Sequence, residues 1–550
     1  MKRVLSKIKY IVALPCMVMM MSSCEDFLNT VPLNEIVLEN FWENETEVNS
    51  VVYSCYSRMS QGDFLTRLLL WGELRSDNVV EGNITGSIPY VNNDQLIKML
   101  EGNIRPNYYI ADWSSFYQVI NRCNTVLHYA PQVLERDPEF KHSEWLAIEA
   151  EMLTLRSLCY FYLVRSFRDV PLVLEPTLDD SKPFVMAAAD PDSVLNLIVE
   201  DLKKAEVNAV VEYPEANSIY SYTKSRVTKQ AVWALLADVL LWMERYDECV
   251  VYCEKVIEAK IEEAEEESMI YDGKYPLLGN QRSNSSTNIH NAYNQIFGSG
   301  FSFESIFEMP FGYNYDKDRD ALRSYYGSVD VPIGCFTAAT FLAEGAAKGN
   351  EYFKPTDVRA VEGFDVDASN VFPIHKYVAS VITDNDEVGY SVNRYFNWIF
   401  YRLTDVMLME AEARVERNDS AANDLREAFN LTAAVYHRAN IQGDVKDTLQ
   451  FGAYSSQDAL RSFVLEERQR ELMFEGKRWF DLVRKARREG SNSAMLDLAT
   501  RKYTNPGSVK SKWIKPDMLY LPIHEDELKV NTLLKQNPEY KSDETITTAK

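Results

Sequence analysis

The chain has 550 residues, of which 46% are hydrophobic and 25% are charged, as in ordinary globular proteins. It exceeds the roughly 250–300 residues at which a single hydrophobic core stops growing, so we expect several domains or a helical array with a continuous core. The formal net charge is −24, and a surface this negative repels nucleic acid and argues against a nucleic-acid-binding function.

The first residues have the pattern of an export signal. Four basic residues within the first nine positions precede an apolar run, Tyr10–Met21, that is too short to span a bilayer. Ser22 and Ser23 then stand directly before Cys24, an arrangement that resembles the lipobox of bacterial lipoproteins. We predict that residues 1–23 are a signal peptide and that Cys24 carries acyl chains, which would hold the protein on a membrane. An ordinary signal peptide with an incidental cysteine is the alternative.

Apolar residues recur at helical spacing along much of the chain, which predicts a mostly α-helical protein. Within residues 228–263, Trp233, Leu236 and Ala237 reproduce the spacing of the first helix of a tetratricopeptide repeat, and a second helical pattern follows. Further helical pairs recur without close sequence identity, so we predict a degenerate tetratricopeptide-like array. The predicted helical segments are 46–60, 112–133, 143–166, 191–206, 228–263, 401–417, 420–439 and 457–487.

Other regions are rich in glycine, proline, asparagine and aspartate and have little helical periodicity, which predicts long loops with short strands. Loops of this length in a compact fold usually carry function. The predicted loop regions are 77–110, 264–300, 310–400 and 488–550, with strands expected at 305–308 and 519–523.

The helical segment that ends at residue 487 is densely charged. Charges three and four residues apart predict ion pairs within the helix, for example between Arg478 and Asp481. Glu471 and Glu475 could instead be a catalytic carboxylate pair. No nucleophile or base motif accompanies them, so we favour the structural interpretation.

Six cysteines lie beyond Cys24, and most of them fall in apolar helical patterns. We therefore predict buried free thiols rather than disulfides. The pair Cys249 and Cys253 is interpreted as helix packing in preference to a redox or metal site. No CxxC or HExxH motif occurs, so no metal site is expected. The six cysteines are Cys55, Cys123, Cys159, Cys249, Cys253 and Cys335.

Several sequence blocks, spread in order along the chain, share the pattern of one known family. The blocks are Cys24–Leu28, Trp113–Asn124, Arg156–Leu172, Glu304–Glu308, Asn397–Ala413, Glu467–Arg484 and Asn531–Tyr540. Together they resemble the SusD/RagB family of outer-membrane nutrient-binding lipoproteins. The most specific block reads Glu-Arg-x2-Glu-Leu-x2-Glu-Gly-x-Arg-Trp-x-Asp-Leu-x-Arg.

The resemblance implies a mostly α-helical fold of about four tetratricopeptide-like helix pairs with a loop-rich ligand-binding face. It implies a single SusD-like domain over 24–550, with an N-terminal region, 24–260, and a C-terminal region, 261–550. Such proteins lie on the outer membrane facing the cell exterior, bind oligosaccharides, and deliver them to a SusC-like TonB-dependent transporter. They are not enzymes and need no cofactor. The alternatives are an exported glycan hydrolase and a peptide-binding RagB-like nutrient receptor.

Sugar binding requires aromatic faces and polar groups on exposed loops, because a sugar ring offers C–H patches for stacking and hydroxyls for hydrogen bonds. We therefore select tyrosines of the predicted loops and their polar neighbours, although each tyrosine could instead pack beneath its own loop. The acidic net charge favours a neutral glycan over an anionic one. The predicted ligand-binding residues are Asp77, Asn78, Tyr90, Asn92, Tyr108 with its neighbour Tyr109, Tyr313, Tyr315 and Tyr326.

Overall fold

A computed structural model describes residues 41–541 with internal gaps. The predicted signal peptide, the predicted lipidation site Cys24 and the ligand candidates Tyr313 and Tyr315 lie outside the described residues. Among the residues that are described, no helix is long and apolar enough to cross a membrane. The gaps are 85–87, 178–184, 214–222, 272, 280–291, 311–319, 328–332, 343–351, 355–356, 365–370, 378–379, 383–387, 391–396, 418–421, 443–444 and 447–448.

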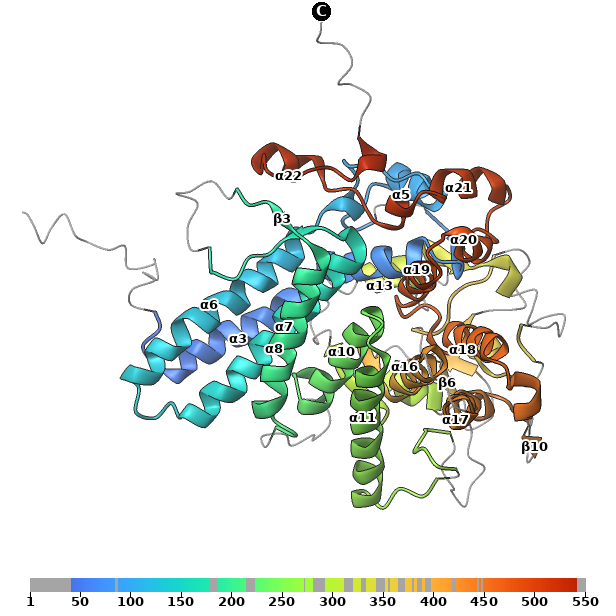
Figure 1. Ribbon diagram of the computed structural model, residues 1–550, viewed down its shortest axis with the longest axis horizontal. Helices are drawn as coiled ribbons and strands as arrows, with labels where there is room; N and C mark the ends of the chain where they lie inside the picture. Colours follow the sequence, from blue (N-terminus) through green and yellow to red (C-terminus); the bar gives the residue numbers. More distant parts are fainter. Residues whose placement is uncertain are drawn as a thin grey trace, which may run out of the picture.

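Long helices of the N-terminal half pack one on another (Figure 1). α6 contacts both α3 and α7, and α8 covers α7 from another side. Every residue of α7 from Ala150 to Phe167 is buried, and apolar side chains occupy all its faces, as expected for a helix enclosed by neighbours. These predicted helices are confirmed with the bounds α3 Glu45–Met59, α6 Ser114–Arg136, α7 His142–Phe167 and α8 Pro191–Asn208.

Polar residues fix the starts of several helices. The side chains of Asn44, Asp190 and Thr228 each accept a hydrogen bond from a backbone N–H of the first turn. This satisfies donors that have no partner inside the helix. Pro191 occupies the first position of α8, where its missing N–H costs no hydrogen bond.

A second group of helices continues the array through the C-terminal half. α11 packs on α10 and on α16, and α16 packs in turn on α17 and α18. The predicted pair at 228–263 divides at residues 243–245, where the tetratricopeptide-like pattern requires a turn. The mostly helical fold is thus confirmed. The bounds are α10 Lys229–Trp242, α11 Tyr246–Glu266, α16 Leu403–Glu416, α17 Ala422–Ala439 and α18 Gln457–Leu472.

The regions predicted as loops contain further short helical segments, which corrects the expectation for all four of them, 77–110, 264–300, 310–400 and 488–550. A helix of about two turns gives too little periodicity to recognise, and docking stabilises it instead. Gly102, just after α5, lies against Val509 and Trp513 of α21. The short helical segments are α4 Gly62–Leu69, η2 Leu70–Leu74, α5 Asn93–Leu100, η3 Tyr109–Ala111, η4 Asn294–Ser299, α13 Asp320–Tyr326, α15 Arg359–Gly363, η6 Phe451–Tyr454, α19 Arg478–Glu489, α20 Ser493–Ala499, α21 Pro506–Trp513, η7 Pro516–Leu519, α22 Glu525–Val530 and η8 Pro538–Tyr540.

The strands form small antiparallel pairs. The expected strand at 305–308 is confirmed within β4, which pairs with β8 so that Met309 stands opposite Trp398. The strand expected at 519–523 does not form, although the structure describes all five residues: η7 ends at Leu519, and Leu521 N donates to Ser166 O. The pairs are β1 Val79–Glu81 with β5 Phe336–Ala338, β2 Val170–Pro171 with β3 Ala188–Ala189, β4 Ser305–Pro310 with β8 Asn397–Arg402, β6 Ser380–Ile382 with β7 Val388–Tyr390, and β9 Ile441–Gln442 with β10 Val445–Lys446.

The long helix predicted at 457–487 is wrong, because the chain breaks between α18 and α19. Phe474 and Gly476 both have φ of +68° there, in the left-handed region that interrupts a helix. The expected pairing of Arg478 with Asp481 is also wrong. Arg478 turns away from its own helix and binds Asp77, at 2.8 Å between Nε and Oδ1.

Buried ion pairs join α18 and the turn after it to the rest of the core. Glu471 accepts hydrogen bonds from Arg402 at 2.6 Å and from Arg359 at 3.1 Å, and it also contacts Arg438. Arg402 additionally binds Glu475, at 2.7 and 2.9 Å. Both glutamates are almost completely enclosed, so they have the structural role that we favoured over a catalytic one.

The six described cysteines are free and buried, as predicted. The sulfur atoms of Cys249 and Cys253 lie 3.9 Å apart within α11, which agrees with packing as their role. Within the described part of the chain, no cluster of three or more His, Cys, Asp or Glu side chains could hold a metal ion.

Candidate functional site

Tyr90 and Tyr109 form an aromatic platform, with Tyr90 reaching solvent. Their ring centroids lie 6.3 Å apart with an interplanar angle of 27°, and the Tyr90 side chain is 41% exposed. Tyr109 is held from below, because its hydroxyl accepts a hydrogen bond from Arg67 at 2.8 Å and donates one to the carbonyl oxygen of Asp63 at 3.1 Å. An exposed ring on a fixed support suits stacking against an apolar ligand face.

Asn92 and Tyr108 differ in their access to a ligand. Asn92 is exposed near Tyr90, and its Oδ1 accepts hydrogen bonds from the backbone of Asp94 and Gln95 at the start of α5. This cap orients the side chain and uses none of its amide hydrogens. Tyr108 is only 8% exposed and offers little surface.

Asp77, Asn78 and Tyr326 lie in the interior with no exposed surface, so no ligand reaches them in this conformation. Burial alone would raise the pKa of Asp77, but Arg478 and Arg501 outweigh it and lower the pKa to about 2. The predicted ligand contacts of these three residues are therefore replaced by structural ones.

Each of the other two interior candidates connects distant segments. The Asn78 side chain donates to Glu73 and accepts from Gln469, both at 2.7 Å. The Tyr326 hydroxyl donates to the carbonyl oxygen of Phe474 at 2.9 Å. These bonds join the segment after η2 to α18, and the end of α13 to the turn after α18.

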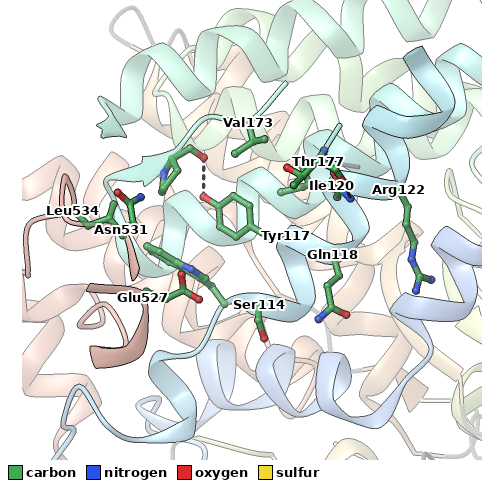
Figure 2. A pocket seen from close by; sticks show the side chains of 13 residues that line it. Ser114, Tyr117, Gln118, Ile120, Arg122, Val173, Thr177, Glu527, Asn531 and Leu534 are labelled. Atoms are coloured by element: carbon green, nitrogen blue, oxygen red, sulfur yellow. Dashed lines mark hydrogen bonds between the residues drawn. The ribbon is translucent and has the colours of Figure 1, made fainter. Parts of the chain in front are cut away.

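A separate cavity of about 460 Å³ opens beside the start of α6 (Figure 2), within the roughly 300–1,000 Å³ typical of small-molecule sites. Its walls come from residues 113–122, from residues 171–177 after β2 and from residues 527–534 near the C-terminus. We call it the α6 pocket.

Two asparagines hold the walls of the α6 pocket together. Asn121 accepts from the backbone N–H of Thr177 at 2.7 Å and donates to its carbonyl oxygen at 3.0 Å. Asn531 makes the same two bonds with the backbone of Met186, at 3.2 and 2.7 Å. Thr177 is thereby fastened to α6, and Met186 is fastened to the C-terminal segment.

The interior of the α6 pocket combines two aromatic side chains, Trp113 and Tyr117, with polar groups. The Tyr117 hydroxyl donates to Pro171 O at 2.7 Å, which fixes the ring in the centre of the view (Figure 2). Gln118 accepts from Arg58 Nε at 2.6 Å. Burial raises the pKa of Glu527, and a hydrogen bond from Trp113 partly offsets that effect.

No sequence pattern indicates the α6 pocket. Tyr117 and Asn121 belong to one of the family-like blocks, but Glu527 lies in a region predicted only as loop. Nothing in the sequence indicates that Tyr117 and Glu527 line the same cavity. The placement of the C-terminal segment depends on bonds such as Asn531 with Met186.

Two family models match the chain. One, described as "SusD family", matches residues 304–540, and the other, described as "Starch-binding associating with outer membrane", matches residues 26–241. The chain belongs to the SusD family. SusD-like proteins P38 and P25 of Formosa agariphila are 22% and 25% identical to it over 84% and 96% of this chain, and 88% and 98% of their own lengths.

Solved SusD-like structures have the same fold. A SusD superfamily protein from Bacteroides vulgatus superposes with a TM-score of 0.65 at 18% identity, over 91% of this chain and 100% of that one. A protein described as a laminarin binding SusD-like protein gives 0.62 at 23% identity, over 90% and 99%. B. fragilis NanU gives 0.61 at 20% identity, over 93% and 100%. Together with the family models, they confirm the family that the sequence blocks indicated.

Proposed function

We propose that this SusD-like protein is a lipid-anchored receptor on the outer surface of the outer membrane, which binds oligosaccharides and passes them to a SusC-like TonB-dependent transporter. Family membership carries the proposal. The family model over 26–241 is described as starch-binding and outer-membrane-associated, and one structural neighbour is described as laminarin binding. The exposed Tyr90 ring on its Tyr109 support is the feature of this chain that best suits a sugar.

The proposed role is capture without catalysis. Glu471 and Glu475, the carboxylates considered as a catalytic pair, are enclosed by arginines and have no open space for a glycosidic bond. Release of shortened products from any bound glycan during prolonged incubation would contradict this part of the proposal.

Replacing Tyr90 with alanine is expected to weaken glycan binding about tenfold or more, because the exposed stacking surface is lost. Isothermal titration calorimetry of the mature protein against neutral oligosaccharides, acidic oligosaccharides and short peptides measures the effect. Tyr90→Phe should retain most of the affinity, since it keeps the ring.

Tyr53→Ala is the matched control for Tyr90→Ala. Tyr53 is a tyrosine of similar exposure, 46%, on α3, and its removal should leave binding unchanged. If the wild type and Tyr90→Ala bind glycan with equal affinity, the Tyr90 platform is not the binding site. If the wild type binds no member of the panel, both glycan binding and peptide binding are contradicted.

Replacing Cys24 with alanine is expected to release the protein from the outer membrane, because the acyl chains have no other attachment point in the predicted lipobox. Cell fractionation and incorporation of labelled palmitate measure the change, and Cys55→Ala serves as the control. A wild-type protein that takes up no label and fractionates with soluble proteins would contradict the predicted lipid anchor.

Co-purification of a TonB-dependent transporter with this protein from solubilised outer membranes tests the proposed partner.

A further inference from the structure

We propose that the α6 pocket is a second carbohydrate site, which binds a neutral sugar unit between Glu527 and Gln118 over the ring of Tyr117. The inference rests on the proposed function, because it assigns the same class of ligand to another place on the molecule. It concerns residues that are distinct from the Tyr90 platform.

The α6 pocket is preorganised for a ligand. Asn121 and Asn531 fasten two walls through paired backbone hydrogen bonds. Val173, in the same wall, is held as well, because Asn124 and Tyr160 both donate to its carbonyl oxygen, at 2.9 and 2.8 Å. Walls that are fixed before binding reduce the ordering that a ligand would otherwise have to impose.

The polar groups of the pocket are oriented for hydroxyl groups. Arg58 Nε donates a hydrogen bond to the amide oxygen of Gln118 at 2.6 Å. The amide nitrogen of Gln118 therefore faces away from Arg58 and can donate to a ligand. Among the hydrogen bonds of the described residues, none involves that nitrogen. Glu527 accepts a hydrogen bond from Trp113, and its carboxylate has further lone pairs that can accept from a ligand on the other side of the Tyr117 ring (Figure 2).

An acceptor, a donor and a fixed aromatic ring around one cavity match the chemistry of a pyranose. Its hydroxyls donate to carboxylates and accept from amides, and its C–H face packs on an aromatic ring. A carboxylate acceptor also makes the stronger, charge-assisted type of hydrogen bond.

The charge of the pocket selects among sugars. Glu527 lies inside, and Asp112 stands nearby and further raises the pKa of Glu527 by repulsion. Arg122, the basic group of the lining, donates to the carbonyl oxygen of Ser54 at 2.5 Å and is directed to α3. An anionic sugar would meet the Glu527 carboxylate, whereas a neutral one meets no opposing charge.

The test compares Glu527→Gln with Glu525→Gln, a matched change on the exposed side of the same short helix, α22. Calorimetry uses maltotriose, laminaritriose, cellotriose, xylotriose and mannotriose as probes. We expect the wild type and Glu525→Gln to bind at least one of them at two sites per chain. Glu527→Gln should lose one of the sites, with its affinity reduced about tenfold or more.

Gln118→Glu provides a second, independent variant. It keeps an oxygen for Arg58 but removes the amide donor, so it should also lose the pocket site. Unchanged thermal unfolding temperatures would show that both variants fold. In Tyr90→Ala, the site that depends on Glu527 should persist, and the double variant Tyr90→Ala/Glu527→Gln should bind no trisaccharide.

If Glu527→Gln and Gln118→Glu both bind every trisaccharide as the wild type does, the proposal of a second site is wrong. The proposed receptor function would be unaffected by that result. A wild type that binds trialanine in the pocket, in a Glu527-dependent way, and no sugar there would overturn the second site as well. A wild type that binds no glycan of any length contradicts the proposed function itself, so the two failures are distinguishable.

Discussion

Replacing Glu471 with alanine is expected to lower the free energy of unfolding by about 3–5 kcal/mol, because it leaves buried guanidinium groups without their shared carboxylate. Glu471 contacts Arg359, Arg402 and Arg438, and all four residues are nearly fully buried. Removal of the Glu471 carboxylate leaves the positive charges of these arginines less well paired, in a region that water does not reach. Denaturant unfolding followed by circular dichroism measures the loss.

The same carboxylate makes stability depend on pH in a defined direction. Burial would raise the pKa of Glu471, but Arg438, Arg402 and Arg359 outweigh it and hold the pKa well below its ordinary value of 4.5. A folded-state pKa below the unfolded-state value means that this stabilisation is complete above about pH 4.5 and declines as the pH falls further. Glu471→Ala should therefore differ from the wild type less in strong acid than at pH 7.

Glu101→Ala is the control for the buried network. Glu101 forms an exposed ion pair with Lys98 at 3.1 Å, and its removal should cost less than about 1 kcal/mol. If Glu471→Ala were as mild as Glu101→Ala, the buried network would contribute nothing and the interpretation of the core would have to change.

The main helices were predictable because each carries many turns of apolar periodicity. α7 spans His142–Phe167, close to the predicted 143–166, and α8 begins at Pro191 as predicted. The break after Leu472 was missed because charged and apolar residues continue at helical spacing through it. Only Gly476 indicates the left-handed turn, and one glycine does not exclude a helix.

Ion-pair partners in the core could not be read from spacing along a helix. Arg478 has Asp481 one turn away, yet it binds Asp77 from the other end of the chain. Local pairing is the economical choice on a solvated helix surface. In a buried block, every charge must find a partner in three dimensions, and the sequence does not reveal which segments will adjoin.

The candidate site was predicted only in part, for a related reason. Tyr90 lies on the surface beside its support, Tyr109, as a loop tyrosine can. Asp77 has the polarity of a surface residue but is buried, since Arg478 and Arg501 neutralise it. No sequence pattern marks Glu527, because its place in the α6 pocket comes from the path of the C-terminal segment back to α6.

Replacing Gly72 with alanine is expected to destabilise the protein by about 3 kcal/mol. Gly72 lies in the π-helical segment η2, where its backbone packs directly on the turn between α18 and α19. An added Cβ would overlap the carbonyl oxygen of Gly476 and lie 2.6 Å from its carbonyl carbon. Because backbone meets backbone, no flexible side chain can move aside. Thermal and denaturant unfolding measure the effect.

Two further contacts make this junction hard to relax. Glu73, the next residue, accepts hydrogen bonds from the backbone N–H groups of Phe474 and Gly476, at 3.3 and 3.2 Å. Moving η2 away from the turn would therefore break bonds to a buried carboxylate. Gly452→Ala is the matched control, because a Cβ there meets nothing within 4 Å and should change stability by no more than about 0.5 kcal/mol. Equal stability of the two variants would mean that η2 and the turn are not in direct contact in solution.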